Sequence, residues 1–422
     1  MKVVFVSTLY TPNERGGAER TVRIIAEALV ANGHQAVVIS LAPDGVAREG
    51  EVNGVRTYYV PLANLFWKQS EQSRSRLARM AWHFIDAWNP VMARRVRRIL
   101  EREKPDVVQT GNLQGFSVSL WRTVRRMNIP LVQMLHDYYL GCPKCTMTRG
   151  TGNCTRQCAG CRIYSTPRRM SSNLPAAVIS LSRRMLTRLE STGLFADVQH
   201  KFIIHGASDA RIHAAPRANR PSGTPIVAGY LGRMEKDTKG IEVLLDAARK
   251  VSADKLTVLL GGKGDDAYVD ALRRTYAGAN IQFLGFVKPA EFLERIDVLV
   301  VPSVWEEPLG RVIYEAYAQG VPSIVADVGG LPEIVDAGRT GFVFRSRDSD
   351  DLAHLLQEQI DAGWRGADFC AACIARSSDF SIERAFADYM RVWETALRTQ
   401  SPGGGHRIAL RGGATPAEPA ST

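Results

Sequence analysis

Residues 297–326 read DVLVVPSVWEEPLGRVIYEAYAQGVPSIVA, and this stretch decides the fold. Residues 297–301 form a short apolar run of the kind found in a strand that is buried on both faces. Residues 309–319 show helical spacing, and residues 323–326 form a second apolar run. A strand, a helix and a strand in this order predict a βαβ unit with parallel strands.

The same alternation continues on both sides of this unit. It is interrupted at residues 211–224, which are poor in large apolar residues and contain several Pro and Gly. The sequence therefore predicts an α/β protein with two Rossmann-like, doubly wound domains that face each other across a cleft. The expected parts are an N-terminal domain at 1–210 with a Cys-rich insertion at 141–165, a linker at 211–224, a C-terminal domain at 225–380, a helix at 381–400 and a disordered tail at 401–422.

The composition is that of a globular protein, because 45% of the 422 residues are hydrophobic and 23% are charged. No apolar run approaches the ~20 residues that span a bilayer, and the first residues lack the features of a signal peptide. We therefore expect a cytoplasmic protein. The net charge of +11 is uneven, since residues 1–210 hold 29 Lys and Arg against 15 Asp and Glu. This excess predicts an anionic partner: nucleic acid, a membrane surface or a phosphorylated ligand.

Two glycine-containing motifs suit the binding of phosphate. Gly16 and Gly17 lie at the start of the first expected helix, where free N–H groups and the helix dipole favour an anion. Arg233 follows an expected strand and Lys239 precedes an expected helix, so both cations would meet an anion at the edge of the cleft. The alternatives are a flexible turn for the glycines and solvated side chains for the cations.

Two glutamates flank a helix start within the opening stretch. Glu307 lies in the loop and Glu315 in the helix, with Leu309, Gly310 and Arg311 between them. Carboxylates accept paired hydrogen bonds from vicinal hydroxyls, and N–H groups at a helix start bind phosphate. This pattern fits a ligand with sugar and diphosphate parts. The alternative is an amphipathic helix with solvated glutamates.

Five of the seven cysteines lie close together, at positions 142, 145, 154, 158 and 161. Four thiolates make a closed tetrahedral zinc site, and these short spacings suit its turns, so that one cysteine is spare. Such a zinc would be structural and would hold an otherwise irregular insertion. Reduced, unliganded cysteines are the alternative, and an iron–sulfur cluster lacks its usual spacing here.

Together, these motifs resemble the retaining family 4 glycosyltransferases of GT-B fold. The matching motifs, in the family's order and approximate spacing, are Gly16-Gly17-Ala18-Glu19, Gly232-Arg233 with Lys239-Gly240, Glu307 with Glu315, and Val328-Gly329-Gly330-Leu331-Pro332-Glu333. The resemblance covers about residues 1–395 and is strongest in 226–345. The chain departs from the family at Leu309, where Phe is usual, and at His205, where Asn is frequent.

The resemblance implies a hexosyltransferase that acts in the synthesis of cell-envelope polysaccharide or glycoconjugates. A nucleotide-diphospho-sugar donor would bind mainly to the C-terminal domain, and a glycan or lipid-linked glycan acceptor would meet the N-terminal domain. No cofactor is expected for catalysis. The leaving diphosphate would help to deprotonate the acceptor hydroxyl, so that the protein contributes positioning and charge stabilisation.

The resemblance also implies a role for individual residues. Glu307 and His136 would be catalytic, with both side chains near the donor sugar. The implied donor-binding residues are Gly16, Gly17, Arg233, Lys239, Leu309, Gly310, Arg311 and Glu315. Of these, Arg233 and Lys239 would neutralise the diphosphate, and Glu315 would bind the ribose. A subset of the family has a similar Cys-rich insertion in its N-terminal domain, which implies a zinc set of Cys142, Cys154, Cys158 and Cys161.

Residues 74–102 predict a basic face on the N-terminal domain. They combine aromatic residues such as Trp82, Phe84 and Trp88 with several arginines. This mixture suits an anionic membrane surface and would place the protein peripherally on the inner face of the cell membrane. The alternative is a helix whose apolar side faces the core and whose arginines are solvated.

Two other functions are open at this point. A zinc-containing nucleic-acid-binding protein would explain the basic half and the cysteines, but no nucleic-acid-binding motif occurs and the carboxylate–glycine site would have no purpose. We therefore expect no nucleic-acid partner. The other option is a GT-B-like epimerase or a non-catalytic sugar-nucleotide binder, against which the intact Arg233, Lys239, Glu307 and Glu315 argue.

Overall fold

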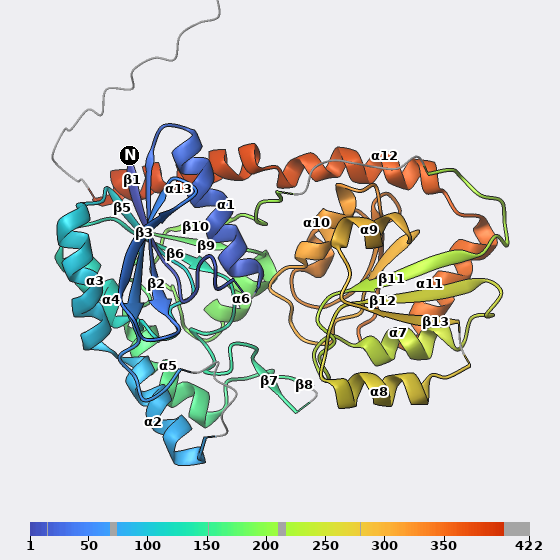
Figure 1. Ribbon diagram of the computed structural model, residues 1–422, viewed down its shortest axis with the longest axis horizontal. Helices are drawn as coiled ribbons and strands as arrows, with labels where there is room; N and C mark the ends of the chain where they lie inside the picture. Colours follow the sequence, from blue (N-terminus) through green and yellow to red (C-terminus); the bar gives the residue numbers. More distant parts are fainter. Residues whose placement is uncertain (15, 68–73, 151, 210–216, 279, 401–422) are drawn as a thin grey trace, which may run out of the picture.

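The computed structural model describes residues 1–14, 16–67, 74–150, 152–209, 217–278 and 280–400. Within them lie two α/β domains, each built on a largely parallel sheet (Figure 1). The predicted fold class is therefore confirmed. The predicted tail at 401–422 and the first part of the predicted linker lie outside the described residues.

The N-terminal domain is built on an eight-stranded sheet of order β10-β9-β6-β5-β1-β2-β4-β3. Its strands are β1 (Lys2–Val6), β2 (Gln35–Ala42), β3 (Arg48–Val52), β4 (Val55–Pro61), β5 (Val107–Thr110), β6 (Leu131–Leu135), β9 (Ala177–Ser180) and β10 (His200–Ile203). All pair in parallel except β3 with β4. The β3–β4 hairpin was not predicted, although its turn is Asn53-Gly54, with φ of 51° and 78°, a pair typical of two-residue hairpins.

Each face of this sheet has its own apolar core, covered by helices. The helices of the N-terminal domain are α1 (Gly17–Ala31), α2 (Arg76–Ala87), α3 (Pro90–Glu103), α4 (Ser119–Arg126), α5 (Ala159–Ser171) and α6 (Arg183–Glu190). A small antiparallel hairpin, β7 (Thr148–Arg149) with β8 (Gly152–Asn153), projects from the Cys-rich insertion toward the other domain (Figure 1).

The C-terminal domain has a six-stranded parallel sheet of order β13-β12-β11-β14-β15-β16. Its strands are β11 (Ile226–Leu231), β12 (Leu256–Gly261), β13 (Ile281–Gly285), β14 (Val298–Val301), β15 (Ser323–Ala326) and β16 (Gly341–Phe344). Its helices are α7 (Ile241–Ala248), α8 (Asp266–Thr275), α9 (Pro289–Glu294), α10 (Arg311–Tyr317), α11 (Ser349–Ala362) and α12 (Gly366–Ser377), with short 3₁₀ turns η1 (Leu331–Glu333) and η2 (Ser378–Phe380).

The βαβ unit predicted from the opening stretch is β14, α10 and β15, and β14 pairs in parallel with β15. Helix α10 is shorter than expected. It begins at Arg311 because Gly310 has φ −99° and ψ 84°, which is not a helical conformation. The loop from 302 to 310 is therefore long, and it carries Glu307.

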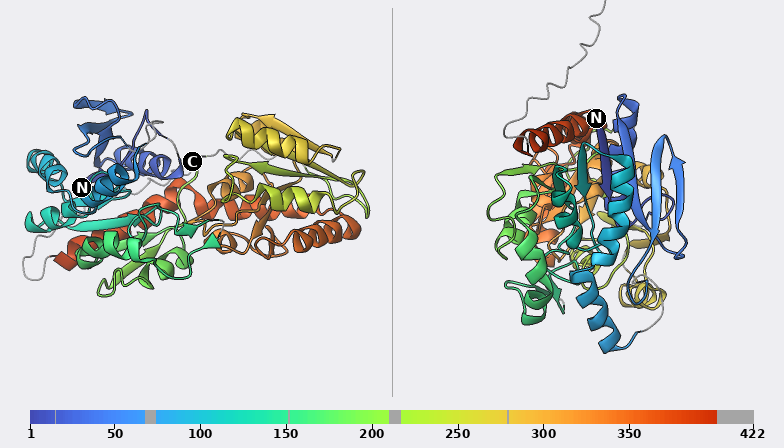
Figure 2. Two further views of the ribbon diagram at one scale, coloured as in Figure 1. Left: turned by 90° about the horizontal axis from the view of Figure 1, so that it is seen from below. Right: turned by 90° about the vertical axis from the view of Figure 1, so that its left-hand side faces the viewer.

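The last helix, α13 (Ile382–Gln400), returns to the N-terminal domain and packs against its sheet (Figures 1 and 2). Trp393 is fully buried there, lies edge-on to Phe5 and donates a hydrogen bond from Nε1 to Gln109 Oε1 at 2.8 Å. The N-terminal domain is therefore completed by the end of the chain.

Both sheets have a point where the chain order reverses, at β1–β5 and at β11–β14. In open parallel sheets, ligands bind beyond the carboxyl ends of the strands at such points. The loops that follow these strands hold most of the predicted site residues. The cleft between the domains is therefore the place to look for the site.

Candidate active site between the domains

Glu307 is buried in the loop between β14 and α10. Its Oε1 accepts a hydrogen bond from Lys239 Nζ at 2.8 Å, whereas its Oε2 has no partner among the described residues. Lys239 lies just before α7, where Gly240 has φ +63° and no room for a Cβ, which would lie 2.0 Å from the oxygen of Pro302. The left-handed glycine thus brings the lysine and its loop against the loop of Glu307.

The Val328–Glu333 motif supports the same loop. Gly330 donates its N–H to the oxygen of Glu307 at 2.8 Å, and a Cβ on Gly329 would lie 2.0 Å from that oxygen. Glu333 reaches the other domain and accepts hydrogen bonds from the N–H groups of Arg183 and Arg184, both at 2.8 Å. The motif therefore fixes the loop of Glu307 and ties it to the start of α6.

Glu315 lies in an ion cluster that joins the domains. Its Oε1 accepts from Arg311 Nε at 3.1 Å and from Arg20 Nη1 at 3.2 Å, and Arg20 also pairs with Asp209 at 2.5 Å. Burial opposes the ionisation of Asp209, but hydrogen bonds from Arg20 and Arg23 hold its pKa below the usual value. The predicted residues Glu315 and Arg311 are thus brought together. Arg20 and Asp209 were not predicted.

Gly16 and Gly17 lie opposite this cluster, at the N-terminus of α1. A Cβ on Gly17 would lie 2.8 Å from Arg311 Cδ. Glu19 accepts a hydrogen bond from Gly16 N at 3.0 Å. The glycine pair therefore lies against the start of α10 in the opposite domain.

Arg233 lies at another part of the cleft. Its side chain is 72% exposed and pairs with Glu235 at 3.0 Å. Arg233 also lines a cavity of about 490 Å³ together with Lys236, Lys263, Tyr268 and their neighbours. Three cations and two carboxylates, those of Glu235 and Asp265, line this cavity.

His136 follows β6 and is completely enclosed. Burial lowers its pKa to about 4, so the imidazole is neutral at pH 7. Neither ring nitrogen has a hydrogen-bond partner among the described residues, which is uncommon for a buried polar side chain. Both ring nitrogens therefore keep unused hydrogen-bonding capacity.

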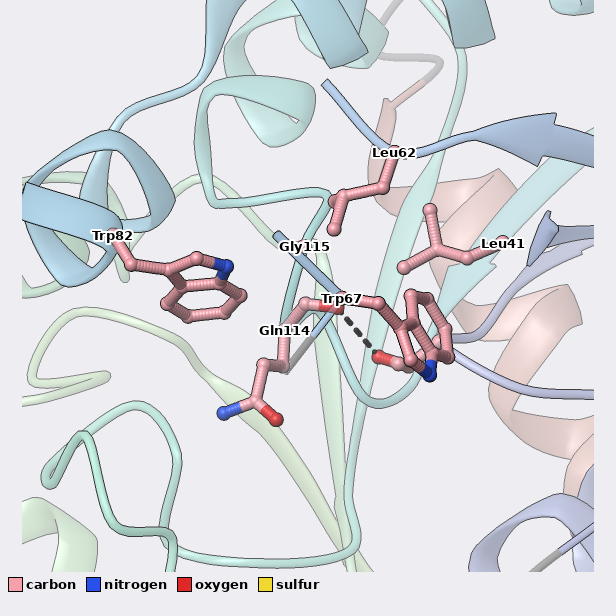
Figure 3. Close-up of a pocket in the computed structure, with 7 residues that line it drawn as sticks. Leu41, Leu62, Trp67, Trp82, Gln114 and Gly115 are labelled. Carbon is pink, nitrogen blue, oxygen red and sulfur yellow. Dashed lines mark hydrogen bonds between the residues drawn. The ribbon is translucent and has the colours of Figure 1, made fainter. Parts of the chain in front are cut away.

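A narrow slot opens next to this region in the N-terminal domain. It lies between Trp67, Trp82, Leu41 and Leu62, with Gln114 at its floor (Figure 3). Its volume of about 10 Å³ holds roughly one water molecule, so it does not admit a sugar in this conformation.

Two family models match this chain. The model for "Glycosyl transferase 4-like domain" matches residues 16–201, and the model for "Glycosyl transferases group 1" matches residues 225–361. The chain is a glycosyltransferase of the GT-B type. The two matches cover the two domains described above, and the loops of Glu307, Glu315 and the glycine pair fall within them.

Curated relatives align with nearly the whole glycosyltransferase. An "uncharacterized 42.6 kDa protein in cps region" of Klebsiella pneumoniae is 27% identical over 334 residues, which cover 79% of this chain and 87% of that protein. The phosphatidyl-myo-inositol mannosyltransferase of Mycobacterium leprae is 26% identical over 413 residues, which cover 93% and 96% of the two chains.

Solved structures share the fold of the glycosyltransferase. Sucrose-phosphate synthase from Thermosynechococcus elongatus superposes with a TM-score of 0.74 at 19% identity, covering 94% of this chain and 99% of that chain. HepE from Anabaena in complex with UDP-glucose superposes with a TM-score of 0.65 at 20% identity, covering 94% and 100%.

The Cys-rich insertion of the glycosyltransferase brings Cys142, Cys158 and Cys161 into contact. The Sγ atoms of Cys142 and Cys161 are 3.7 Å apart, and Cys161 N donates to Cys158 Sγ at 3.5 Å. Burial and the nearness of Cys142 and Cys158 raise the pKa of Cys154. Cys145 instead accepts from Gln114 Nε2 at 3.5 Å. Nevertheless, in the described part of the chain no three His, Cys, Asp or Glu side chains are arranged to hold a metal ion.

The aromatic residues of the predicted basic face divide between core and surface. Trp82 is buried, as the core-facing alternative expects, whereas Phe84 and Trp88 are exposed. Among the described residues of the glycosyltransferase, no helix is long and apolar enough to cross a bilayer.

Proposed function

We propose that this glycosyltransferase transfers a hexosyl group, with retention of anomeric configuration, from a nucleotide-diphospho-sugar to a glycan or lipid-linked glycan acceptor. The reaction would serve cell-envelope polysaccharide or glycoconjugate synthesis. The observation that carries the proposal is the buried Glu307, which has one oxygen bonded to Lys239 and the other unpartnered. The complex of HepE with UDP-glucose supports a nucleotide-sugar donor for this fold.

In this proposal the donor lies between Glu307 and the start of α1. Lys239 and Arg233 neutralise the diphosphate, and the backbone of Leu309, Gly310 and Arg311 approaches the phosphates and the sugar. Gly16 and Gly17 close on the diphosphate from the N-terminal domain. Glu315 binds the ribose hydroxyls, for which it exchanges hydrogen bonds now made with Arg20 and Arg311.

The transfer step needs no protein nucleophile in this proposal. The bond between the anomeric carbon and the diphosphate oxygen breaks, and the acceptor oxygen bonds to that carbon on the same face. The acceptor proton passes to the leaving diphosphate. Glu307 and the neutral His136 contact the donor sugar and hold it in position while the positive charge develops.

A panel of nucleotide-diphospho-sugars tests the proposal by release of the nucleoside diphosphate. We expect release with at least one donor, and an approximately tenfold or larger rise in the donor Kd for Glu315→Ala, since a bidentate hydrogen-bond acceptor is lost. Glu358→Ala, at an exposed position of α11, is the control and should leave the donor Kd unchanged. Unchanged donor affinity of Glu315→Ala would contradict the ribose role, and no release with any donor and acceptor mixture would contradict the function.

We also propose that Cys142, Cys154, Cys158 and Cys161 bind a structural zinc. The Sγ atoms of Cys142 and Cys161 are 3.7 Å apart and Cys161 N donates to Cys158 Sγ, and the contact with Cys161 lowers the pKa of Cys142 to about 6, which favours the thiolate that zinc requires. Small shifts of the side chains would complete a tetrahedral set. A purified protein with no zinc by elemental analysis, even after refolding with excess zinc, would contradict this proposal.

We further propose that helices α2 and α5 bind an anionic membrane surface. Large apolar side chains are exposed on these two packed helices and beside them: Leu77, Met80, Phe84, Trp88, Ile163 and Met170. The same helices carry Arg76, Arg79, Arg162 and Arg169, whereas Asp86, the only acidic residue within 74–100, is buried and paired with Arg168. No Asp or Glu occurs from Tyr138 to Leu189. This surface combines apolar insertion with cationic attraction.

Sedimentation with vesicles of phosphatidylcholine, with or without phosphatidylglycerol, measures this binding. We expect binding only to the vesicles with phosphatidylglycerol, and release at high salt. Leu77→Asp places a charge at a 77% exposed position of α2 and should reduce binding about tenfold or more, whereas Phe286→Asp, at a 75% exposed position of the C-terminal domain, should not. Equal loss in both variants, or no binding at low salt, would exclude this surface.

A further inference from the structure

The Cys-rich insertion touches the loop of Glu307 across the cleft. Asn153, in β8, donates a hydrogen bond from Nδ2 to the oxygen of Val304 at 3.0 Å and accepts one at Oδ1 from Glu306 N at 3.2 Å. One side chain thus bonds two backbone groups of the opposite domain, and one of these groups belongs to the residue directly before Glu307. Two such bonds fix the backbone of the loop in orientation as well as position.

The N-terminal domain makes two further contacts with this loop, in addition to the bonds that Gly330 and Arg347 make with it from its own domain. Trp305 packs against the core of the N-terminal domain, with its ring edge-on to Tyr138 at 6.4 Å between centroids. Ser182 donates its hydroxyl to the oxygen of Pro308 at 2.8 Å. The N-terminal domain therefore contacts the loop on both sides of Glu307, and Asn153 makes the contact on the side of Val304 and Glu306.

The position of Asn153 depends on backbone hydrogen bonds within the Cys-rich insertion. The β7–β8 hairpin pairs only two residues on each strand, which is too little to be stable alone. It is anchored where Cys154 N donates to the oxygen of Met147 at 2.8 Å, and where Tyr138 N donates to the oxygen of Cys145 at 3.1 Å. The insertion thus connects the cysteines, Tyr138 and Asn153 in one unit.

We propose that the Cys-rich insertion positions the loop of Glu307, and that Asn153 is the positioning residue. The inference rests on the proposed contact of Glu307 with the donor sugar. Asn153 does not touch the donor in this proposal. It acts through the backbone of Val304 and Glu306, so that Glu307 meets the sugar only when the two domains are closed and the insertion is folded.

Hydrogen–deuterium exchange and steady-state kinetics of Asn153→Ala test the proposal. We expect faster exchange in the peptide that contains Glu306, because its N–H loses its acceptor, and an approximately tenfold fall in kcat with the donor KM nearly unchanged. Asn173→Ala is the matched control. Asn173 makes a similar pair of hydrogen bonds within the N-terminal domain. Its Nδ2 donates to Asp197 Oδ2 at 2.5 Å, and its Oδ1 accepts from Asp197 N at 3.2 Å.

The two measurements separate this inference from the proposed function. Unchanged exchange around Glu306 in Asn153→Ala would overturn the contact itself, whatever the enzyme transfers. Faster exchange with wild-type kcat would overturn the positioning role. Asn153→Asp keeps the acceptor for Glu306 N and loses the donor to Val304. It should therefore restore slow exchange at Glu306 and part of kcat. If Asn153→Asp behaves like Asn153→Ala in both measurements, the proposal is also contradicted.

Discussion

Replacing Glu307 by glutamine is expected to lower kcat/KM for the donor by about 10²-fold or more. The substitution keeps the size of the side chain and removes its charge. The carboxylate is buried and pairs with Lys239 at 2.8 Å, so its charge acts in a region of low dielectric, where a preorganised group stabilises developing positive charge strongly. This stabilisation acts mainly on the transition state, so its loss should lower kcat more than it raises KM.

Glu291→Gln is the control for this measurement, since Glu291 is exposed on α9 and pairs with the exposed Lys288. We expect its kinetics to equal those of the wild type. Melting temperatures of both variants should be measured beside the kinetics, so that a loss of folded enzyme is not taken for a loss of chemistry. A fall of less than about threefold for folded Glu307→Gln would remove Glu307 from the catalytic role that we propose.

The largest effect on stability is expected for Asp86→Ala. Asp86 of α2 is completely buried and accepts hydrogen bonds from Arg168 Nη2 of α5 at 3.2 Å, Tyr139 Oη at 2.8 Å and Gly115 N at 2.5 Å. Its removal leaves the guanidinium of Arg168 buried without its counter-charge, which costs about 3–5 kcal/mol. Calorimetry should show the first unfolding transition lowered by about 10 °C.

An exposed pair provides the comparison for Asp86. Asp270 pairs with Arg273 at 3.5 Å on the surface of α8, with both side chains more than half exposed. Asp270→Ala should leave both transitions where they are in the wild type, because exposed ion pairs contribute little. If Asp86→Ala has the same melting temperatures as Asp270→Ala, the ion pair of Asp86 with Arg168 does not hold α2 and α5 together.

The alternation of strands and helices was sufficient to predict both domains, because buried parallel strands are continuous apolar runs that are easily recognised. The β3–β4 hairpin was missed because it interrupts a parallel pattern, although Asn53-Gly54 carried a signal for it. The glycine pair, Glu307 and Lys239 were found as motifs, and the structure places them around one cleft. Glu307 and Lys239 form a direct ion pair that no spacing predicts, since 68 positions separate them.

Other parts of the site could not be read from the sequence because they depend on contacts between distant segments. Arg20 meets Glu315 of the opposite domain, and Asn153 meets Val304 and Glu306, only after both domains have folded and closed. The presence of one Arg or Asn in a sequence does not indicate which distant residue it will contact. The burial of both nitrogens of His136 without partners is likewise a property of the packed structure alone.

The return of α13 to the N-terminal sheet has a consequence for how the protein can be cut and expressed. Topologically, the C-terminal domain is an insertion within the N-terminal domain, since residues from both ends of the chain build one core around Phe5, Tyr389 and Trp393. A fragment that ends with the C-terminal domain and lacks α13 would leave an apolar face of the N-terminal sheet exposed to water, and such surfaces aggregate. A split or truncated protein therefore needs residues 382–400 together with the N-terminal domain, either fused to it or added as a separate peptide.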